Sequence, residues 1–393
     1  MMYVGIALLC LSYICSQFFR SFLAVLSNQL SLDIGASADQ LALASGLWFL
    51  AFSAMQIPIG WALDKFGPRL TAGLLFVIGG GGGAALFAAA QAVWHLHVAM
   101  ALLGVGCAPV LMGAYFIFAR LYPAKVFATL AAVMVGVGSL GNLAGSAPLV
   151  YAVQALGWRE AMAIIAALSV AIGAGLLLFV RNPEPFSGKA EGSLLDLLRL
   201  RALWLILPLM LMSYAPAAGL RGVWIGPYLT TVHGAGPDAV GRAAMIMSLA
   251  MIVGTLVYGP LDRLFKTRKW VVFGGNALGA LCLAVLGLFP HIGYTGAVAA
   301  FALVGFFGMS YPVLVAHGRS FAPAHLTGRG VTLMNLFSIA GVGVFQVITS
   351  RLQKAVVADG GVGADAYDPL FMLYAFALLV SLLIYALSQD RLD

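Results

Sequence analysis

Charged residues are scarce in this sequence. Of its 393 residues only 9% are Asp, Glu, Lys or Arg, whereas a soluble globular protein has about 25%. Apolar residues make up 62%, and the mean hydropathy is +1.00. So few charges cannot solvate a soluble fold, which excludes a soluble enzyme, a nucleic-acid-binding protein and a disordered protein. The composition predicts an integral membrane protein, and the apolar runs are long enough for helices rather than barrel strands.

Cysteine is also rare, and the sequence has no cofactor motif. The glycine run Gly79 to Gly83 is not followed by Lys-Ser/Thr, so it is not a phosphate loop. The cysteines lie in apolar runs without the spacing of metal ligands, which predicts packing residues rather than disulfides. We therefore expect no cofactor and no metal site. The four cysteines are Cys10, Cys15, Cys107 and Cys282.

Twelve apolar segments are each long enough to cross a bilayer as a helix of about 20 residues. The predicted fold class is therefore all-α, with twelve transmembrane helices. We expect an N-terminal six-helix bundle at 1–181, a cytoplasmic connection at 182–200, and a C-terminal six-helix bundle at 201–393. The connection reads either as an amphipathic surface helix or as a plain linker. The spans lie near 3–27, 40–63, 71–93, 97–121, 127–153, 160–181, 202–231, 241–261, 270–289, 295–318, 331–352 and 369–388.

The distribution of basic residues predicts the orientation. If both termini are cytoplasmic, fifteen Lys and Arg residues fall on inside loops and four on outside loops, as the positive-inside rule requires. The net charge of +7 then reflects topology rather than nucleic-acid binding. We expect a monomeric multi-pass protein in the lipid bilayer of a bacterial inner membrane.

The two halves of the sequence repeat each other. Ser12-Tyr13 is followed after six residues by Arg20, and Ser213-Tyr214 is followed after six residues by Arg221. A Gly-containing segment with an acidic-basic pair ends the second and eighth spans, and Arg with a nearby Pro ends the fourth and tenth. Three landmarks in the same order, about 200 residues apart, predict a duplicated six-span unit.

The segment Gly60-Trp61-Ala62-Leu63-Asp64-Lys65-Phe66-Gly67-Pro68-Arg69 resembles the signature of the major facilitator superfamily between its second and third spans. Pro68 is a mild departure from that signature. The resemblance implies a secondary transporter, not an enzyme, built from two pseudo-symmetric six-helix bundles that work by alternating access. It also implies gating rather than substrate contact for Gly60, Asp64, Lys65, Gly67 and Arg69, and for the degenerate second copy at Asp262 and Arg263.

A simpler interpretation of this segment is a charge cluster that only sets topology. Physically, a carboxylate such as Asp64 at a helix end can pair with basic groups and with a neighbouring helix N-terminus. Such a contact stabilises one state of the bundle, which favours gating.

Arg20 and Arg221 are the only charges deep inside predicted spans, and they occupy equivalent positions. A charge inside the bilayer costs a few kcal/mol or more, so it is a functional candidate. The family resemblance implies that spans 1, 4, 7 and 10 line the central cavity. Two arginines without a buried carboxylate would then bind an anion by forked hydrogen bonds. The alternative is that each arginine reaches outward to the membrane surface.

Polar and aromatic residues share a helical face with each arginine. Tyr115 and Tyr311, on the fourth and tenth spans, are further candidates for the cavity. Arg20 and Arg221 also resemble the arginine pair of the organophosphate:phosphate antiporter branch, and carboxylate substrates stay open. The stripes are Tyr13, Gln17, Arg20 and Ser27 on the first span, and Tyr214, Arg221, Trp224 and Tyr228 on the seventh.

The sequence offers little for proton coupling. All fourteen acidic residues lie in loops or at helix ends. His317 is the only histidine well inside a cavity-lining span, and we interpret it as an interfacial histidine satisfied by backbone rather than a proton carrier. Exchange or facilitated diffusion is therefore favoured over proton symport.

We expect a transporter of a small organic anion, carboxylated or phosphorylated. The alternatives are a multidrug or metabolite exporter, a copper importer using Met247 and Met251, and a transport-dead receptor or scaffold. Methionine at helical spacing more often fills a core. The glycines Gly136, Gly138, Gly141 and Gly145 form a ladder that we interpret as packing between the halves.

Overall fold

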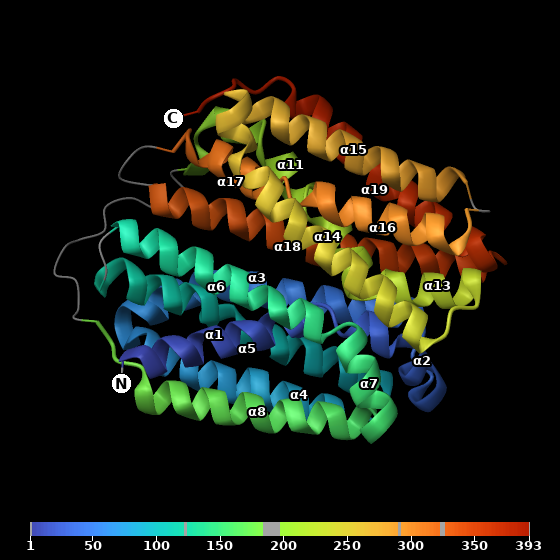
Figure 1. Ribbon diagram of the computed structural model, residues 1–393, viewed down its shortest axis with the longest axis horizontal. Coiled ribbons are helices and arrows are strands. Elements are labelled where there is room, and N and C mark those ends of the chain that lie inside the picture. Colours follow the sequence, from blue (N-terminus) through green and yellow to red (C-terminus); the bar gives the residue numbers. More distant parts are fainter. Residues whose placement is uncertain (1, 122–123, 184–196, 290–291, 323–326, 393) are drawn as a thin grey trace. The chain divides into compact units, whose positions relative to one another are not determined.

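The computed structural model describes residues 2–121, 124–183, 197–289, 292–322 and 327–392. These residues form helices joined by short loops, and the chain divides into two compact units (Figure 1). Unit 1 comprises Met1–Ser187 with Pro237–Arg242, and unit 2 comprises Gly188–Gly236 with Ala243–Asp393. Most of the connection expected at 182–200 lies outside the described residues.

Unit 1 contains the helices of the first half of the sequence. They are α1 (Met2–Phe18), α2 (Leu23–Ile34), α3 (Ala38–Leu75), the π-helical η1 (Phe76–Gly81), α4 (Gly82–Ala88), α5 (Val93–Leu121), α6 (Ala124–Ala144), α7 (Ala147–Leu156) and α8 (Trp158–Phe179).

Unit 2 contains the helices of the second half, apart from the start of α14. They are α10 (Arg201–Trp204), α11 (Leu207–Met212), α12 (Ala215–Gly219), the π-helical η2 (Leu220–Trp224), α13 (Ile225–His233), α14 (Pro237–Phe265), α15 (Lys269–Leu288), α16 (Tyr294–Gly308), α17 (Tyr311–Arg319), α18 (Thr327–Ala358), the 3-10 turn η4 (Gly363–Ala366) and α19 (Asp368–Tyr385). Figure 1 shows α15 and α19 side by side in this unit.

Among the described residues, eight helices are long and apolar enough to cross a bilayer, and two bent helix pairs raise the number to ten. One of the eight, Ala38–Ala88, covers two of the predicted spans. The two spans meet at a kink at Gly67, where φ is 79°. The seventh predicted span is missing from this count because it is broken into short helices. The second span within Ala38–Ala88 and the broken seventh span bring these ten to twelve, so the helices correspond to the twelve predicted spans.

The first span bends by 54° between α1 and α2. At the bend the backbone switches to shorter i−3 hydrogen bonds, such as Arg20 N–H to the Gln17 carbonyl at 3.2 Å. The Ser21 hydroxyl also donates to the carbonyls of Gln17 and Phe18. Serine hydroxyls that bond back to the preceding turn bend helices. Arg20 therefore lies at a discontinuity of its span, not on the regular helix expected from the stripe.

The seventh span differs more from the continuous helix predicted for 202–231. Pro208 and Pro216 stand in the first turns of α11 and α12. Proline lacks the N–H that would continue a preceding helix but suits the start of a new one. The π-helical η2 then carries Arg221. The matched arginines thus both occupy irregular backbone.

Two glycines 200 residues apart make the same kind of contact. A Cβ on Gly141 of α6 would lie 1.9 Å from the carbonyl oxygen of Ile14 in α1. A Cβ on Gly341 of α18 would lie 1.8 Å from the carbonyl oxygen of Leu211 in α11. In each unit the fifth span of the repeat therefore packs backbone to backbone on its first span.

The glycine ladder of α6 packs inside unit 1, on α1. Gly138 lies under the ring of Tyr13, and Gly145 lies against Ser21. The prediction that this ladder packs between the halves was wrong for these residues, because the small residues accommodate α1 of the same unit. The glycine run at 79–83 does allow close approach, since a Cβ on Gly79 would lie 2.5 Å from the nitrogen of Gly106.

Candidate substrate-binding and gating sites

Arg20 is buried in unit 1 and retains only 8% of its exposed surface. Its guanidinium lies over two aromatic rings of α3, with Cζ 4.9 Å from the centroid of Trp48 and 4.9 Å from that of Phe52. Among the described residues Arg20 forms no salt bridge, and its Nε has no hydrogen-bond partner. In this structure its guanidinium therefore turns to the interior of the unit, not to the membrane surface.

Tyr13 and Gln17 lie one turn apart on α1, below the bend. Both are buried, and Nε2 of Gln17 donates a hydrogen bond to the Tyr13 hydroxyl at 3.1 Å. The Oε1 atom of Gln17 is buried without a hydrogen-bond partner in the described part of the chain. Tyr115 is half-buried on α5, which packs against α1. The structure thus brings the candidates of the first and fourth spans into one region of unit 1.

Arg221 is among the most buried large side chains of unit 2, at 1% exposure. The next turn carries Trp224, which is fully buried and packs edge-on against Tyr367 with ring centroids 6.2 Å apart. Burial of both arginines fits the position of their spans inside each bundle.

The remaining aromatic candidates of unit 2 fall into two places. Tyr214 and Tyr311 contact each other, with ring centroids 4.9 Å apart. Tyr228 instead packs edge-on among Phe301, Tyr367 and Phe371 and is fully buried. Tyr228 thus belongs to a tight aromatic cluster, whereas Tyr214 and Tyr311 form a separate pair.

The buried side chains of the described residues include two arginines and one histidine but no Asp or Glu. The histidine, His317, lies with Nε2 at 2.9 Å from the Gln389 carbonyl and Nδ1 at 2.7 Å from the Tyr385 hydroxyl. A carbonyl can only accept, so Nε2 carries the proton and Nδ1 accepts from Tyr385. His317 is therefore satisfied in place, as expected, with a tyrosine as well as a backbone partner.

The methionines of α14 fill the core of unit 2. Met247 and Met251 are buried, and both lie against Gly305 of α16. No cluster of three His, Cys, Asp or Glu side chains that could hold a metal occurs in the described ranges. Met247 and Met251 thus serve as packing residues in this unit, as methionine at helical spacing usually does.

The candidate gating segment of unit 1, residues 60–69, makes contacts that its own sequence does not reveal. Asp64 pairs with Arg120 of α5, Oδ1 to Nη2 at 3.6 Å. Lys65 lies over the rings of Trp61 and Phe66, with Nζ 4.9 and 5.5 Å from their centroids. Gly60 has open space around its Cβ position. The carboxylate thus bonds to the end of the fourth span rather than to the adjacent Lys65.

Asn182, just after α8, braces the kink at Gly67. Its Oδ1 accepts the Arg69 backbone N–H at 3.0 Å, and its Nδ2 donates to the Phe66 carbonyl at 3.2 Å. Arg69 also donates from Nε to the Leu177 carbonyl of α8. A Cβ on Gly67 would lie 2.4 Å from the Asn182 side chain. The contacts of Asn182 could not be predicted from the sequence, because an Asn before Pro183 indicates only a helix stop.

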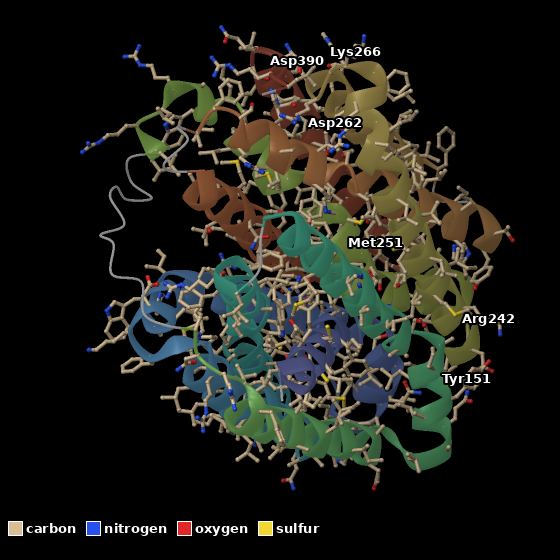
Figure 2. The ribbon with its side chains drawn as sticks, turned by 60° about the vertical axis from the view of Figure 1, so that its left-hand side comes forward. Tyr151, Arg242, Met251, Asp262, Lys266 and Asp390 are labelled. Carbon is tan, nitrogen blue, oxygen red and sulfur yellow. The ribbon has the colours of Figure 1, made fainter. Side chains whose placement is uncertain are left out.

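The second copy of the motif in unit 2 pairs differently. Asp262 Oδ2 lies 3.2 Å from Nε of Arg268, and both side chains are partly buried, whereas Arg263 is exposed. Figure 2 shows Asp262, Lys266 and Asp390 at the same end of this unit. The basic partner of Asp262 is thus the residue just before α15, not its sequence neighbour.

The C-terminal segment is bonded to the start of α15. Asp390 accepts hydrogen bonds from the Thr267 hydroxyl and from the backbone N–H groups of Arg268 (3.2 Å) and Lys269 (3.0 Å). Lys269 donates from Nζ to the carbonyls of Ala386 and Ser388. Although partial burial opposes it, these hydrogen bonds hold the pKa of Asp390 below its ordinary value.

Residues 9–345 match the family model described as Major Facilitator Superfamily. The chain belongs to this superfamily. It is 25% identical over 429 residues to the hexuronate transporter of Escherichia coli (strain K12), covering 98% of this chain and 94% of the relative. It is 26% identical over 311 residues to the "Probable L-galactonate transporter" of the same organism, covering 70% of this chain and 64% of the relative.

A solved structure agrees on the fold. A bacterial homologue of the human lysosomal transporter Spinster, in an inward-facing and occupied conformation, matches with a TM-score of 0.75 at 17% identity. The match covers 98% of this chain and 96% of that chain. The predictions of family and of a twelve-helix membrane fold are confirmed, and the chain is a multi-pass transporter, not an enzyme.

Proposed function

We propose that this protein transports a small organic anion carrying a carboxylate, of the sugar-acid class, and that Arg20 and Arg221 bind it. One observation carries the proposal. Two arginines 201 residues apart are buried at equivalent positions of the repeat, each where its span departs from a regular helix. Discontinuous helices commonly form the binding sites of transporters.

The electrostatics of unit 1 support an anionic ligand. A buried charge in a membrane protein is expensive unless a partner compensates it. Arg20 has no carboxylate partner among the described residues, and none of their Asp or Glu side chains is buried. An anionic substrate would supply the missing charge, and its carboxylate matches the two parallel N–H donors of a guanidinium.

Hydrogen-bonding groups near the arginines favour a hydroxylated substrate. In the part of the chain that the structure describes, the Oε1 of Gln17 and the Nε1 of Trp224 are buried without hydrogen-bond partners. Buried polar groups are normally satisfied, so a substrate with hydroxyl groups could pair with them. The hexuronate and L-galactonate named for the two relatives combine a carboxylate with hydroxyls, which favours a carboxylate over a phosphoryl group.

We further propose a monomer in a bacterial inner membrane, with both termini cytoplasmic. Asp64–Arg120 and Asp262–Arg268 would then stabilise one conformation at the cytoplasmic side. Tyr13, Gln17, Tyr115 and Trp224 would contact substrate, and Tyr214 with Tyr311 would do so as a pair. Exchange or facilitated diffusion is favoured, because His317 is held by fixed partners and no Asp or Glu of the described residues is fully buried.

The test is a ligand panel on detergent-purified protein, read as the shift in melting temperature. The panel contains D-glucuronate, L-galactonate, tartrate, glucose 6-phosphate, a hydrophobic cation and Cu(I). A ligand that binds only the folded state raises the melting temperature by mass action. We expect a sugar acid to raise it, and Arg20→Gln and Arg221→Gln each to abolish the shift and uptake into proteoliposomes.

Other outcomes point to the alternatives. Stabilisation by glucose 6-phosphate alone would move the substrate to a phosphorylated anion. Stabilisation by the hydrophobic cation or by Cu(I) alone would indicate an exporter or a copper importer. Normal binding of sugar acids by both Gln variants would overturn the roles of the two arginines.

A further inference from the structure

Two rings of α3 hold the guanidinium of Arg20. Trp48 and Phe52 are one helical turn apart and stack on each other, with centroids 5.1 Å apart and planes 18° apart. The Arg20 Cζ lies 4.9 Å from each centroid. The three points form a nearly equilateral triangle, so both rings lie on the same side of Cζ. The rings therefore do not enclose the guanidinium from both sides.

This aromatic platform, Trp48 with Phe52, is packed rigidly. Trp48 is fully buried, and Phe52 retains 4% exposure. Phe49 contacts the Trp48 ring edge-on, with centroids 4.9 Å apart. Behind the platform, a Cβ on Gly104 of α5 would lie 2.3 Å from the Trp48 carbonyl oxygen, so α5 packs directly on this turn of α3. This close packing limits how far the rings can move away from Arg20.

The platform orients the positive charge without neutralising it. Arg120 and Arg159 also lie over rings, but each of them additionally pairs with a carboxylate, Asp64 or Asp33. Arg20 has the rings but no such carboxylate among the described residues. A cation over the face of Trp or Phe is attracted to the ring quadrupole, which holds the side chain without using any of its N–H groups as hydrogen-bond donors.

The repeat does not place aromatic residues on α14 where α3 carries this platform. The stretch of α14 that corresponds to 48–52 in the repeat, and the residues on either side of it (244–256), contain no aromatic residue. Arg221 lies in a π-helical turn, whereas Arg20 lies against two rings. The two halves therefore differ at this position of the repeat.

We propose that Trp48 and Phe52 are positioning residues that hold Arg20 ready to receive the anionic group of the substrate. The inference rests on the proposed function, in which Arg20 binds an anion. An arginine side chain that is already ordered loses less rotamer freedom when substrate binds. The platform thus tightens binding of the anion through Arg20.

The test compares ring-deleting and ring-retaining variants with D-glucuronate as the probe. Removal of a cation–π contact predicts about a three- to tenfold rise in Kd and KM for Phe52→Leu and Trp48→Leu, with kcat nearly unchanged. Trp48→Phe retains a ring, so its KM should stay near the wild-type value. Phe49→Leu is the matched control, because Phe49 is an equally buried ring of the same turn that does not lie over Arg20.

Each outcome separates this inference from the proposed function. If Arg20→Gln binds D-glucuronate normally, the proposed function fails. If Arg20→Gln loses binding while Phe52→Leu and Trp48→Leu bind normally, only the positioning role fails. Equal losses in Phe49→Leu and Phe52→Leu would also overturn it, because the rings would then act by packing alone. If Trp48→Leu does not fold, Phe52→Leu against Phe49→Leu decides the question.

Discussion

Oδ1 of Asp64 lies 3.6 Å from Nη2 of Arg120, which joins the end of the second span to the end of the fourth within unit 1. The Asp64 side chain is 72% exposed and that of Arg120 is 25% exposed. Solvent screens such a pair, and exposed ion pairs contribute only about 0–1 kcal/mol. The pair can therefore bias a conformational equilibrium without locking it.

Asp64→Asn should slow turnover modestly and leave substrate affinity unchanged. Loss of up to about 1 kcal/mol changes a rate by no more than about fivefold. Transport into proteoliposomes gives turnover, and the thermal-shift titration gives affinity. Lys65→Gln removes the adjacent basic charge but leaves the Asp64–Arg120 pair in place, because Lys65 lies over Trp61 and Phe66. A large affinity loss with normal turnover in Asp64→Asn would contradict a gating role.

Gly67→Ala should destabilise the protein for two separable reasons. The backbone there has φ 79°, which costs an L-residue about 1–2 kcal/mol. The new Cβ would also lie 2.4 Å from the Asn182 side chain. The melting temperature of the double variant Gly67→Ala/Asn182→Ala should therefore be higher than the sum of the two single effects predicts. Simple additivity would show that Asn182 does not brace the kink.

Asp390→Asn should lower the melting temperature near neutral pH, because it replaces a carboxylate with a neutral amide. The carboxylate accepts hydrogen bonds from the Thr267 hydroxyl and from two backbone N–H groups at the start of α15. Loss of a helix cap of about 1 kcal/mol corresponds to about 1–3 °C.

The pH dependence follows from the lowered pKa of Asp390. A group whose native pKa lies below its unfolded value of about 3.9 stabilises the fold above that pH. The contribution is lost as the pH falls through the native pKa. The difference between wild type and Asp390→Asn should thus be constant from pH 7 to 5 and shrink below about pH 4. The exposed Asp359 supplies the control, Asp359→Asn. A difference that grows on acidification would contradict this assignment.

Gly141→Ala and Gly341→Ala should each prevent normal folding. The added methyl would meet a backbone carbonyl at 1.9 or 1.8 Å, and backbone cannot rotate away as a side chain can. Gly136→Ala is the matched control on α6, since nothing lies within 4 Å of its Cβ position. This control should be neutral or stabilising by up to about 1 kcal/mol. Monodisperse yield on gel filtration measures all three, and normal yield of Gly141→Ala would contradict the contact.

The fold was predictable from the sequence because the bilayer requires each spanning segment to be apolar over its own length. Each span must contain enough apolar residues to cross, so a window of about 20 residues is enough to find it. The prediction erred where the backbone departs from a regular helix. Helical periodicity assumes constant geometry, and it gave no sign that Arg20 and Arg221 stand at a bend and in a π-helical turn.

The site was harder to predict, because its contacts join distant parts of the chain. Arg120 is 56 residues from Asp64, and Asn182 is 113 residues from Arg69. In the sequence Trp48 and Phe52 look like any other aromatic pair on a membrane helix. Such a pair can face lipid, pack in the core or contact a charged side chain. Their i, i+4 spacing was the only available signal, and it does not name a partner.

The close approach at Gly141 and Gly341 also bears on how this gene can vary. If the repeat arose by duplication, the same backbone contact has persisted in both copies, while the residues around it have diverged. Every nucleotide change that alters a glycine codon's meaning adds at least a methyl group or ends the chain. Neither position has room for a methyl group, so both codons should change only silently.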